Sequence, residues 1–250
     1  MSARILVHLK QEPLIEVAWE IRFGAKDNLP LGQMLPGLLY QAFKTEFSQI
    51  TRLPTADIPM PIAKANEMLA YLPSFRLEAG PSLPFVIQIG ERMVSLNNRR
   101  PYMGWRGFRA RVESLIEQLH KTGLITQPER FSLKYANLLQ HDVLNSLDGM
   151  NVELKLAGRN LVSAPMQLRA ELHQGDLIHV VQIMNPVDVV LVGNEKLSGV
   201  LIDIDTVGKG GEDFWDRLMH NLDVAHEQSE QLFVDLLGDQ TLQRLEPVYT

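Results

Sequence analysis

The feature that most constrains the fold is an alternation of apolar and polar residues with a period of two. Between Ile15 and Phe23 every second residue is apolar, and the residues between them are Glu, Ala, Glu and Arg. This period predicts a strand with one buried and one wetted face. Residues 131–135, 152–156 and 166–172 alternate in the same way. Because buried parallel sheets require continuous apolar runs, the pattern predicts a mostly antiparallel sheet.

Glycine-containing turns separate several of these segments. Gly90-Glu91 lies between the apolar runs 85–89 and 93–96, and Gly175-Asp176 separates two further strands. Short turns of this composition predict hairpins. Residues 51–84 contain six prolines, so we expect a meandering connection there, with one strand near 69–77.

Three segments carry the apolar stripe of an amphipathic helix. They cover 31–49, 105–121 and 212–237, and the last two stop at Gly123 and Gly238. Adjacent runs of strands exclude a regular alternating parallel fold. The predicted class is therefore α+β: a mixed, mostly antiparallel sheet with two helices and a long C-terminal helix packed on one face.

Length and composition bound the organisation and the compartment. With 250 residues, 45% of them hydrophobic, the chain predicts a single α+β domain over 1–250; two intimately packed halves, 1–141 and 150–250, are the alternative. The chain has no cysteine, which excludes disulfides, thiolate zinc sites and cysteine nucleophiles. With neither an apolar leader nor a run of about 20 apolar residues, we expect a cytoplasmic protein without a membrane span.

The net charge of −6 limits the class of binding partner that the sequence favours. Nucleic-acid binders carry a basic footprint, so the balance disfavours nucleic acid as the main partner, although a local basic patch would remain compatible with it. No sequence pattern indicates a cofactor, and the oligomeric state is left open.

Four phrases, taken in order, resemble a known family. They lie at 13–23, 101–108, 130–137 and 201–205. In this order and spacing the chain resembles a sporadically distributed bacterial family of uncharacterised proteins of about 250 residues. The resemblance implies no activity, and the scattered occurrence suggests an accessory role such as defence or a toxin–antitoxin system. The chain departs from the family at Leu237-Gly238-Asp239, where a threonine usually follows the leucine.

Asp203 and Asp205 are the most suggestive acidic pair. Two residues apart on a strand, their side chains point to the same face. With Glu212 they would supply oxygen ligands for Mg²⁺ or Ca²⁺. The simpler interpretation is that Val200, Ile202 and Ile204 face the core while the acids face water.

The run Gly208-Lys209-Gly210-Gly211 precedes the third predicted helix. Backbone amides of such a loop can cradle phosphate. The run lacks the spacing of the known phosphate-binding fingerprints, and Glu212 and Asp213 would repel an anion. A strand-to-helix turn is the favoured interpretation.

The histidines show no metal-binding spacing. His220 and His226 are about 120° apart on a helix, so they cannot form a pair at positions i and i+4. His226 borders the apolar stripe, which favours a hydrogen-bonded structural role. His173 and His179 share a face only if the turn between them has three residues rather than two.

Arginine and aromatic residues cluster before and at the start of the second helix. The cluster comprises Arg99, Arg100, Tyr102, Trp105 and Arg106, and we expect Arg109 and Arg111 to extend its basic character into the helix. Such clusters suit protein interfaces and stacked bases. The alternative is that the aromatic residues anchor a loop on the core and the arginines are solvated.

Three hypotheses follow for the function. The first is a non-enzymatic recognition or regulatory protein that binds a protein partner through the arginine–aromatic cluster. The second is a metal-dependent enzyme that acts on phosphate esters or nucleic acid through Asp203, Asp205 and Glu212. The third is a small-molecule sensor with a ligand between the sheet and the long helix.

Overall fold

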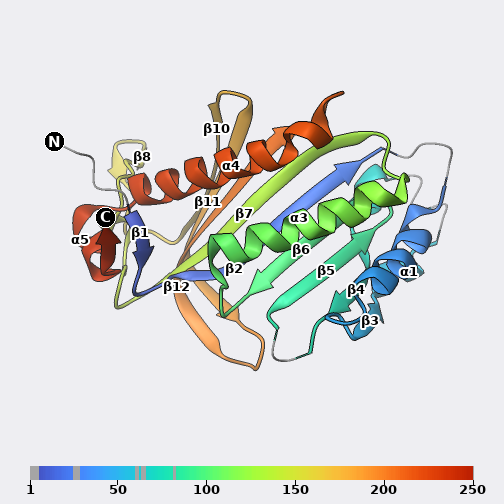
Figure 1. The fold of residues 1–250 in the computed structure, drawn as a ribbon. Helices are drawn as coiled ribbons and strands as arrows, with labels where there is room; N and C mark the ends of the chain where they lie inside the picture. Colours follow the sequence, from blue (N-terminus) through green and yellow to red (C-terminus); the bar gives the residue numbers. More distant parts are fainter. Residues whose placement is uncertain (1–5, 25–28, 60–61, 63–65, 81–82, 250) are drawn as a thin grey trace. The chain divides into compact units, whose positions relative to one another are not determined.

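A nine-stranded antiparallel sheet dominates the computed structural model, which describes residues 6–24, 29–59, 62, 66–80 and 83–249. The strand order is β10-β11-β12-β7-β2-β6-β5-β4-β3 (Figure 1). The bounds are β2 (Leu14–Phe23), β3 (Gln49–Arg52), β4 (Pro73–Glu78), β5 (Phe85–Gly90), β6 (Met93–Arg99), β7 (Pro128–Gln140), β10 (Met166–Gln174), β11 (Leu177–Val190) and β12 (Lys196–Lys209). The predicted α+β class with an antiparallel sheet is confirmed.

The three predicted helices are confirmed, with shifted ends. They are α1 (Leu31–Phe43), α3 (Gly104–Thr122) and α4 (Phe214–Leu236), and a short α5 (Asp239–Arg244) follows. The first helix ends at Phe43 and not at residue 49, where β3 begins. Gly123, with φ of 64°, ends α3 as expected, since this left-handed conformation suits glycine.

The smaller elements correct two expectations. The strand expected near 69–77 begins later, at Pro73, because Glu67–Tyr71 form the 3₁₀ helix η2. The alternation at 152–156 yields only β8 (Lys155–Leu156), which pairs with β9 (Arg159–Asn160). Val152 and Leu154 pack on a core cluster without being in a strand. The remaining elements are β1 (Leu6–Leu9), which pairs with β13 (Pro247–Tyr249), and the 3₁₀ helices η1 (Pro54–Asp57) and η3 (Leu147–Gly149).

The chain divides into two compact units, each built from separate segments. The first unit comprises 1–15, 135–206 and 224–250, and the second comprises 16–134 and 207–223. The chain passes between them within β2, β7, β12 and α4. Neither unit is a single continuous stretch, and the description of 1–250 as one domain stays a prediction.

The second unit packs α1 and α3 on strands. In Figure 1, α3 lies across β6 and α1 lies beside β4, as their contacts also show. The stripe Phe108, Val112 and Leu119 of α3 is fully buried, and so are Trp19 and Ile21 of β2. The predicted apolar faces of both elements therefore lie in the core.

Helix α1 receives its N-terminal cap from the turn between β5 and β6. The carboxylate of Glu91 accepts hydrogen bonds from the backbone N–H groups of Leu31 and Gly32, each at 3.0 Å. The N–H groups of the first two helical residues are satisfied in this way, and the negative charge suits that end of the helix dipole. Burial raises the pKa of Glu91, and the two backbone hydrogen bonds partly oppose this.

The first unit has core clusters on both faces of β12. One cluster includes Val181, Ile183, Ile202, Ile204 and Phe233, and a second includes Leu138, Leu197 and Leu201. Neighbouring residues of β12 therefore enter different clusters. Among the described helices, none combines the length and apolar character that a membrane crossing demands.

Candidate protein-binding turn

A buried asparagine holds the turn that carries the arginine–aromatic cluster. Asn98, the sixth residue of β6, is 1% exposed. Its Nδ2 donates to the carbonyl oxygens of Arg99 at 2.5 Å and Pro101 at 3.2 Å. Its Oδ1 accepts from the backbone N–H of Met103 at 3.1 Å. One side chain thus forms hydrogen bonds with three backbone groups within the five-residue span 99–103.

The turn then leads directly into α3. Gly104 begins the helix with φ of 76°, a conformation in which a residue with a Cβ would be strained. Trp105 follows, half-buried, with its ring 6.3 Å from that of Phe108, which is fully buried. This contact agrees, for Trp105, with the alternative in which the aromatic residues anchor the loop on the core.

The outer side of the turn is both cationic and apolar. Arg100 and Arg106 are exposed, Arg99 and Tyr102 are half-buried, and Met103 is 52% exposed. Within the described part of the chain, neither Arg99 nor Arg106 forms an ion pair. We call residues 99–106 the Arg99–Arg106 turn.

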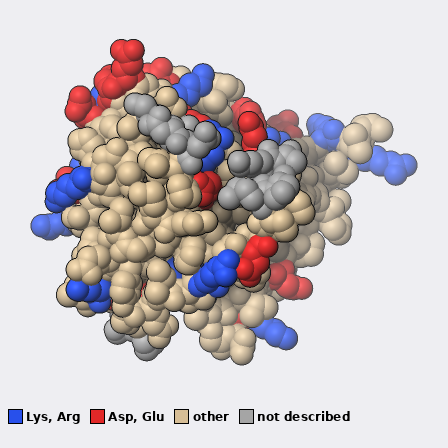
Figure 2. All heavy atoms as spheres, turned by 90° about the vertical axis from the view of Figure 1, so that its right-hand side faces the viewer, with Lys and Arg blue, Asp and Glu red and all other residues tan. Residues whose placement is uncertain are grey.

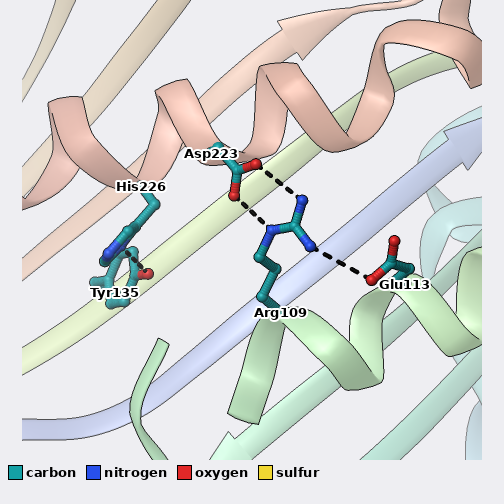
Figure 3. A network of polar contacts seen from close by, with 5 residues as sticks. All are labelled: Arg109, Glu113, Tyr135, Asp223 and His226. Carbon is teal, nitrogen blue, oxygen red and sulfur yellow. Dashed lines mark hydrogen bonds and ion pairs between the residues drawn. The ribbon is translucent and has the colours of Figure 1, made fainter. Parts of the chain in front are cut away.

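The basic surface does not extend along α3 beyond Arg106 in its first turn, contrary to expectation. Arg109 binds Asp223 through two hydrogen bonds, Nε–Oδ1 at 2.7 Å and Nη2–Oδ2 at 2.9 Å, and also pairs with Glu113 (Figure 3). The hydrogen bond to Asp223 raises the pKa of Arg109. Arg111 pairs with Glu46, and its guanidinium lies 4.5 Å from the centroid of the Phe85 ring. Both charges are neutralised within the second unit, so the cationic surface is confined to the turn.

One face of the molecule, drawn in Figure 2, has mixed charge. On this face Lys and Arg side chains are scattered among acidic ones, and most of the surface belongs to residues that are neither basic nor acidic. On the part of this face that the structure describes, the view shows no continuous basic stripe of the kind that tracks a nucleic-acid backbone.

The expectation that both acids of β12 face water is wrong. Val200, Ile202 and Ile204 are buried as predicted, but Asp203 is also only 6% exposed. Asp205 is half-buried, and its Oδ1 is shielded from solvent. The reason is that the second face of β12 is also covered, since Leu201 belongs to its own core cluster. Among the described residues, no group of three or more His, Asp or Glu side chains could hold a metal ion. The proposed ligands Asp203, Asp205 and Glu212 therefore do not form such a group.

The glycine run has a packing role. A Cβ on Gly208 would lie 2.2 Å from the Phe131 ring, and one on Gly210 would lie 2.1 Å from the Pro128 carbonyl oxygen. The N–H of Gly210 donates to the carbonyl oxygen of Glu129 at 2.7 Å. These glycines allow β12 and the residues after it to approach β7, which supports the interpretation as a strand-to-helix turn.

Two histidines have structural hydrogen bonds in the first unit. His226 Nδ1 lies 2.8 Å from the Tyr135 hydroxyl, which confirms the expected structural role (Figure 3). His179 pairs with Leu172 across the two-residue turn, and His173 pairs with Ile178. His173 and His179 therefore lie on opposite faces, as a two-residue turn requires.

His179 belongs to a buried chain of hydrogen bonds. Ser229 Oγ donates its single hydrogen to the carbonyl oxygen of Ala225 at 2.7 Å, so Thr206 Oγ1 must donate to Ser229 Oγ at 2.6 Å. Thr206 Oγ1 then accepts from His179 Nδ1 at 2.8 Å, which places the imidazole hydrogen on Nδ1. The Nε2 atom lies 3.2 Å from Gln228 Oε1, and this contact is a hydrogen bond only when Nε2 is protonated as well, because the amide oxygen can only accept.

We expect His179 to make the stability of the protein pH-dependent. Burial lowers the pKa of His179 below 6.5, and its hydrogen bond to Gln228 partly opposes this. The unfolded chain therefore takes up the proton first as the pH falls. The stabilisation that neutral His179 contributes should be fully present above pH ~6.5. Below that pH the free energy of unfolding should decrease, by at most about 1.4 kcal/mol per pH unit.

Urea unfolding of wild type and His179→Gln between pH 7.5 and 5 checks this expectation. The decrease should be smaller in His179→Gln, whereas His220→Gln, which changes an exposed histidine, should behave as wild type. An identical pH dependence in all three proteins would show that His179 does not titrate differently on folding.

Sequence reasoning missed the residues that organise and limit the turn. Asn98 directly precedes the predicted cluster and was not counted in it, because nothing in the sequence marks its side chain as buried. Glu46 and Asp223, which neutralise Arg111 and Arg109, are 65 and 114 residues away from them in the chain. No local signal could have revealed these pairs.

A scan against models of known protein families and a search of curated proteins found no match.

Proposed function

We propose that this chain is a non-enzymatic recognition protein that binds a protein partner through the Arg99–Arg106 turn. The observation that supports it best is the buried Asn98 side chain, which fixes a turn with an exposed methionine and with Arg99 and Arg106, two arginines that form no ion pair in the described part of the chain. Arginine, methionine and aromatic residues are enriched in protein interfaces relative to the rest of the surface. A turn that is already ordered loses little entropy on binding.

The chemistry of the turn defines the partner. Arg99 and Arg106 favour a surface with carboxylates, and Met103 with the half-buried rings of Tyr102 and Trp105 favours an apolar spot between them. An acidic protein surface with a central apolar pocket fits this arrangement. The resemblance to an accessory bacterial family is compatible with such a role.

Native mass spectrometry of gently purified protein tests the proposal. Wild type should carry a protein partner, and Arg106→Glu and Trp105→Ala should each weaken that complex about thirtyfold, because arginine and tryptophan anchors commonly contribute 2 kcal/mol or more. Circular dichroism must show that the variants remain folded.

Lys121→Glu is the matched control. It makes the same charge change in the last turn of α3, on a lysine that is paired with Glu117. It should leave the complex intact. Unchanged binding in Arg99→Glu, Arg100→Glu and Trp105→Ala together would refute the assignment of this surface.

A further inference from the structure

The strand β10 forms one edge of the sheet, and its sequence is complementary to itself. Among the strands that the described residues form, β10 has a neighbour on one side only, which is β11 (Figure 1). An edge strand presents unpaired backbone groups that can pair with another strand. Residues 168–172 read Leu-Arg-Ala-Glu-Leu. Read against its own reverse, this segment places leucine opposite leucine, arginine opposite glutamate and alanine opposite alanine.

The turn between β10 and β11 determines which backbone groups point outward. Gln174 pairs with Leu177 across Gly175-Asp176, and Gly175 has φ of 60°, as in a two-residue turn with glycine first. The residues that flank such a turn are hydrogen-bonded to each other, so Gln174, Leu172, Ala170 and Leu168 direct their backbone groups to β11. The alternate residues Gln167, Arg169, Glu171 and His173 direct theirs outward.

We propose that a second copy of this chain pairs with β10 through β10, antiparallel and centred on Ala170. In this register Arg169 of each copy lies opposite Glu171 of the other. Both residues belong to the outward set, so each pair also exchanges two backbone hydrogen bonds. The contact has twofold symmetry, which a dimer of identical chains requires.

Charge selects this register over its neighbours. Arg169 and Glu171 are 54% and 46% exposed and form an ion pair within the strand at 2.6 Å. In the dimer the four charges form a square in which every neighbour has the opposite sign. Antiparallel pairing centred on residue 169 or 171, or parallel pairing in register, would place like charges opposite each other, which is unfavourable.

The opposite face of the strand supports the same register. Leu172 is 43% exposed, although it lies on the face that carries the half-buried Leu168 and Ala170. Across the proposed contact, Leu172 meets Leu168 of the second copy. Apolar pairs directly opposite each other stabilise a sheet, and Ala170 at the centre leaves room for the leucines.

Sedimentation equilibrium over a range of concentrations tests the dimer. The mass of wild type should rise from 28.3 kDa toward twice that value. Arg169→Glu and Glu171→Arg should each dissociate about tenfold more readily, since both symmetric pairs change from attraction to repulsion. Arg159→Glu, at an exposed arginine of β9, should associate as wild type does.

Two rescues separate this contact from a general effect of charge or misfolding. The double variant Arg169→Glu/Glu171→Arg should regain the dimer, and an equimolar mixture of the two single variants should form a one-to-one dimer. Amide hydrogen exchange should slow at Gln167, Arg169, Glu171 and His173 on association. A wild-type mass of 28.3 kDa at every concentration, or a dimer that neither single variant weakens, would overturn the proposal.

Discussion

Replacing Gly199 with alanine should lower the free energy of unfolding by about 3 kcal/mol. A Cβ at this position of β12 would lie 2.1 Å from the carbonyl oxygen of Leu139 and 2.9 Å from the Cα of Gln140. Both atoms belong to the backbone of β7, the neighbouring strand in the sheet. A flexible side chain could move away, but the strand backbone can yield only by disturbing its own pairing. Urea unfolding of the variant and wild type measures the difference.

Gly37 provides the matched control with an expected effect of the opposite sign. It is an exposed residue inside α1, and a Cβ there would meet no described atom within 4 Å. Gly37→Ala should raise the free energy of unfolding by about 0.5–1 kcal/mol, because alanine favours the helix. If both variants were equally stable, the close approach of β12 to β7 would not be a rigid feature of the fold.

Replacing Asn98 with alanine should destabilise the protein by about 2–4 kcal/mol and disable the Arg99–Arg106 turn. The change removes a side chain that makes three hydrogen bonds to the backbone of the turn. It leaves part-buried carbonyl and amide groups without this partner, and an unpaired group of this kind costs about 1–3 kcal/mol when it is shielded from water. Binding of the protein partner should weaken as strongly as in Arg106→Glu, although no contact residue is altered.

Asn97→Ala is the control, because it removes the neighbouring asparagine of β6 and leaves Asn98 in place. Asn97 is half-buried and bonds side chains only: its Nδ2 donates to Glu16 at 3.0 Å and its Oδ1 accepts from Ser95 at 2.9 Å. Its loss should cost about 1 kcal/mol and spare the complex. Thermal unfolding and the binding measurement together decide; wild-type stability in Asn98→Ala would remove the basis for a preorganised turn.

The strands and hairpins were predictable because their signals are local. The alternation at 15–23 and 166–172 and the turn at Gly175-Asp176 each depend on a few adjacent residues. The alternation at 152–156 is equally regular, but Val152 and Leu154 reach a core cluster from outside any strand. Burial of alternate residues therefore indicates that one face of a segment is covered. It does not require that the segment pair with another strand.

The candidate site was predictable only in its composition. Arginine and aromatic residues at 99–106 were evident in the sequence, whereas their confinement to the turn depends on Glu46 and Asp223, which neutralise Arg111 and Arg109 from distant segments. Asp203 shows the same limit. Its alternation with isoleucine indicated exposure, but the cluster around Leu201 covers the second face of β12.

The sequence by itself determined the α+β class, the antiparallel pairing within hairpins and the three main helices, because periodicity and turn chemistry act over a few residues. Only the tertiary structure decided which faces are covered, which arginines keep an unneutralised charge and which strand lies at the edge. Those properties depend on pairing between segments that are far apart in the chain. A self-complementary strand such as β10 has no consequence until the fold leaves its outer edge without a neighbour.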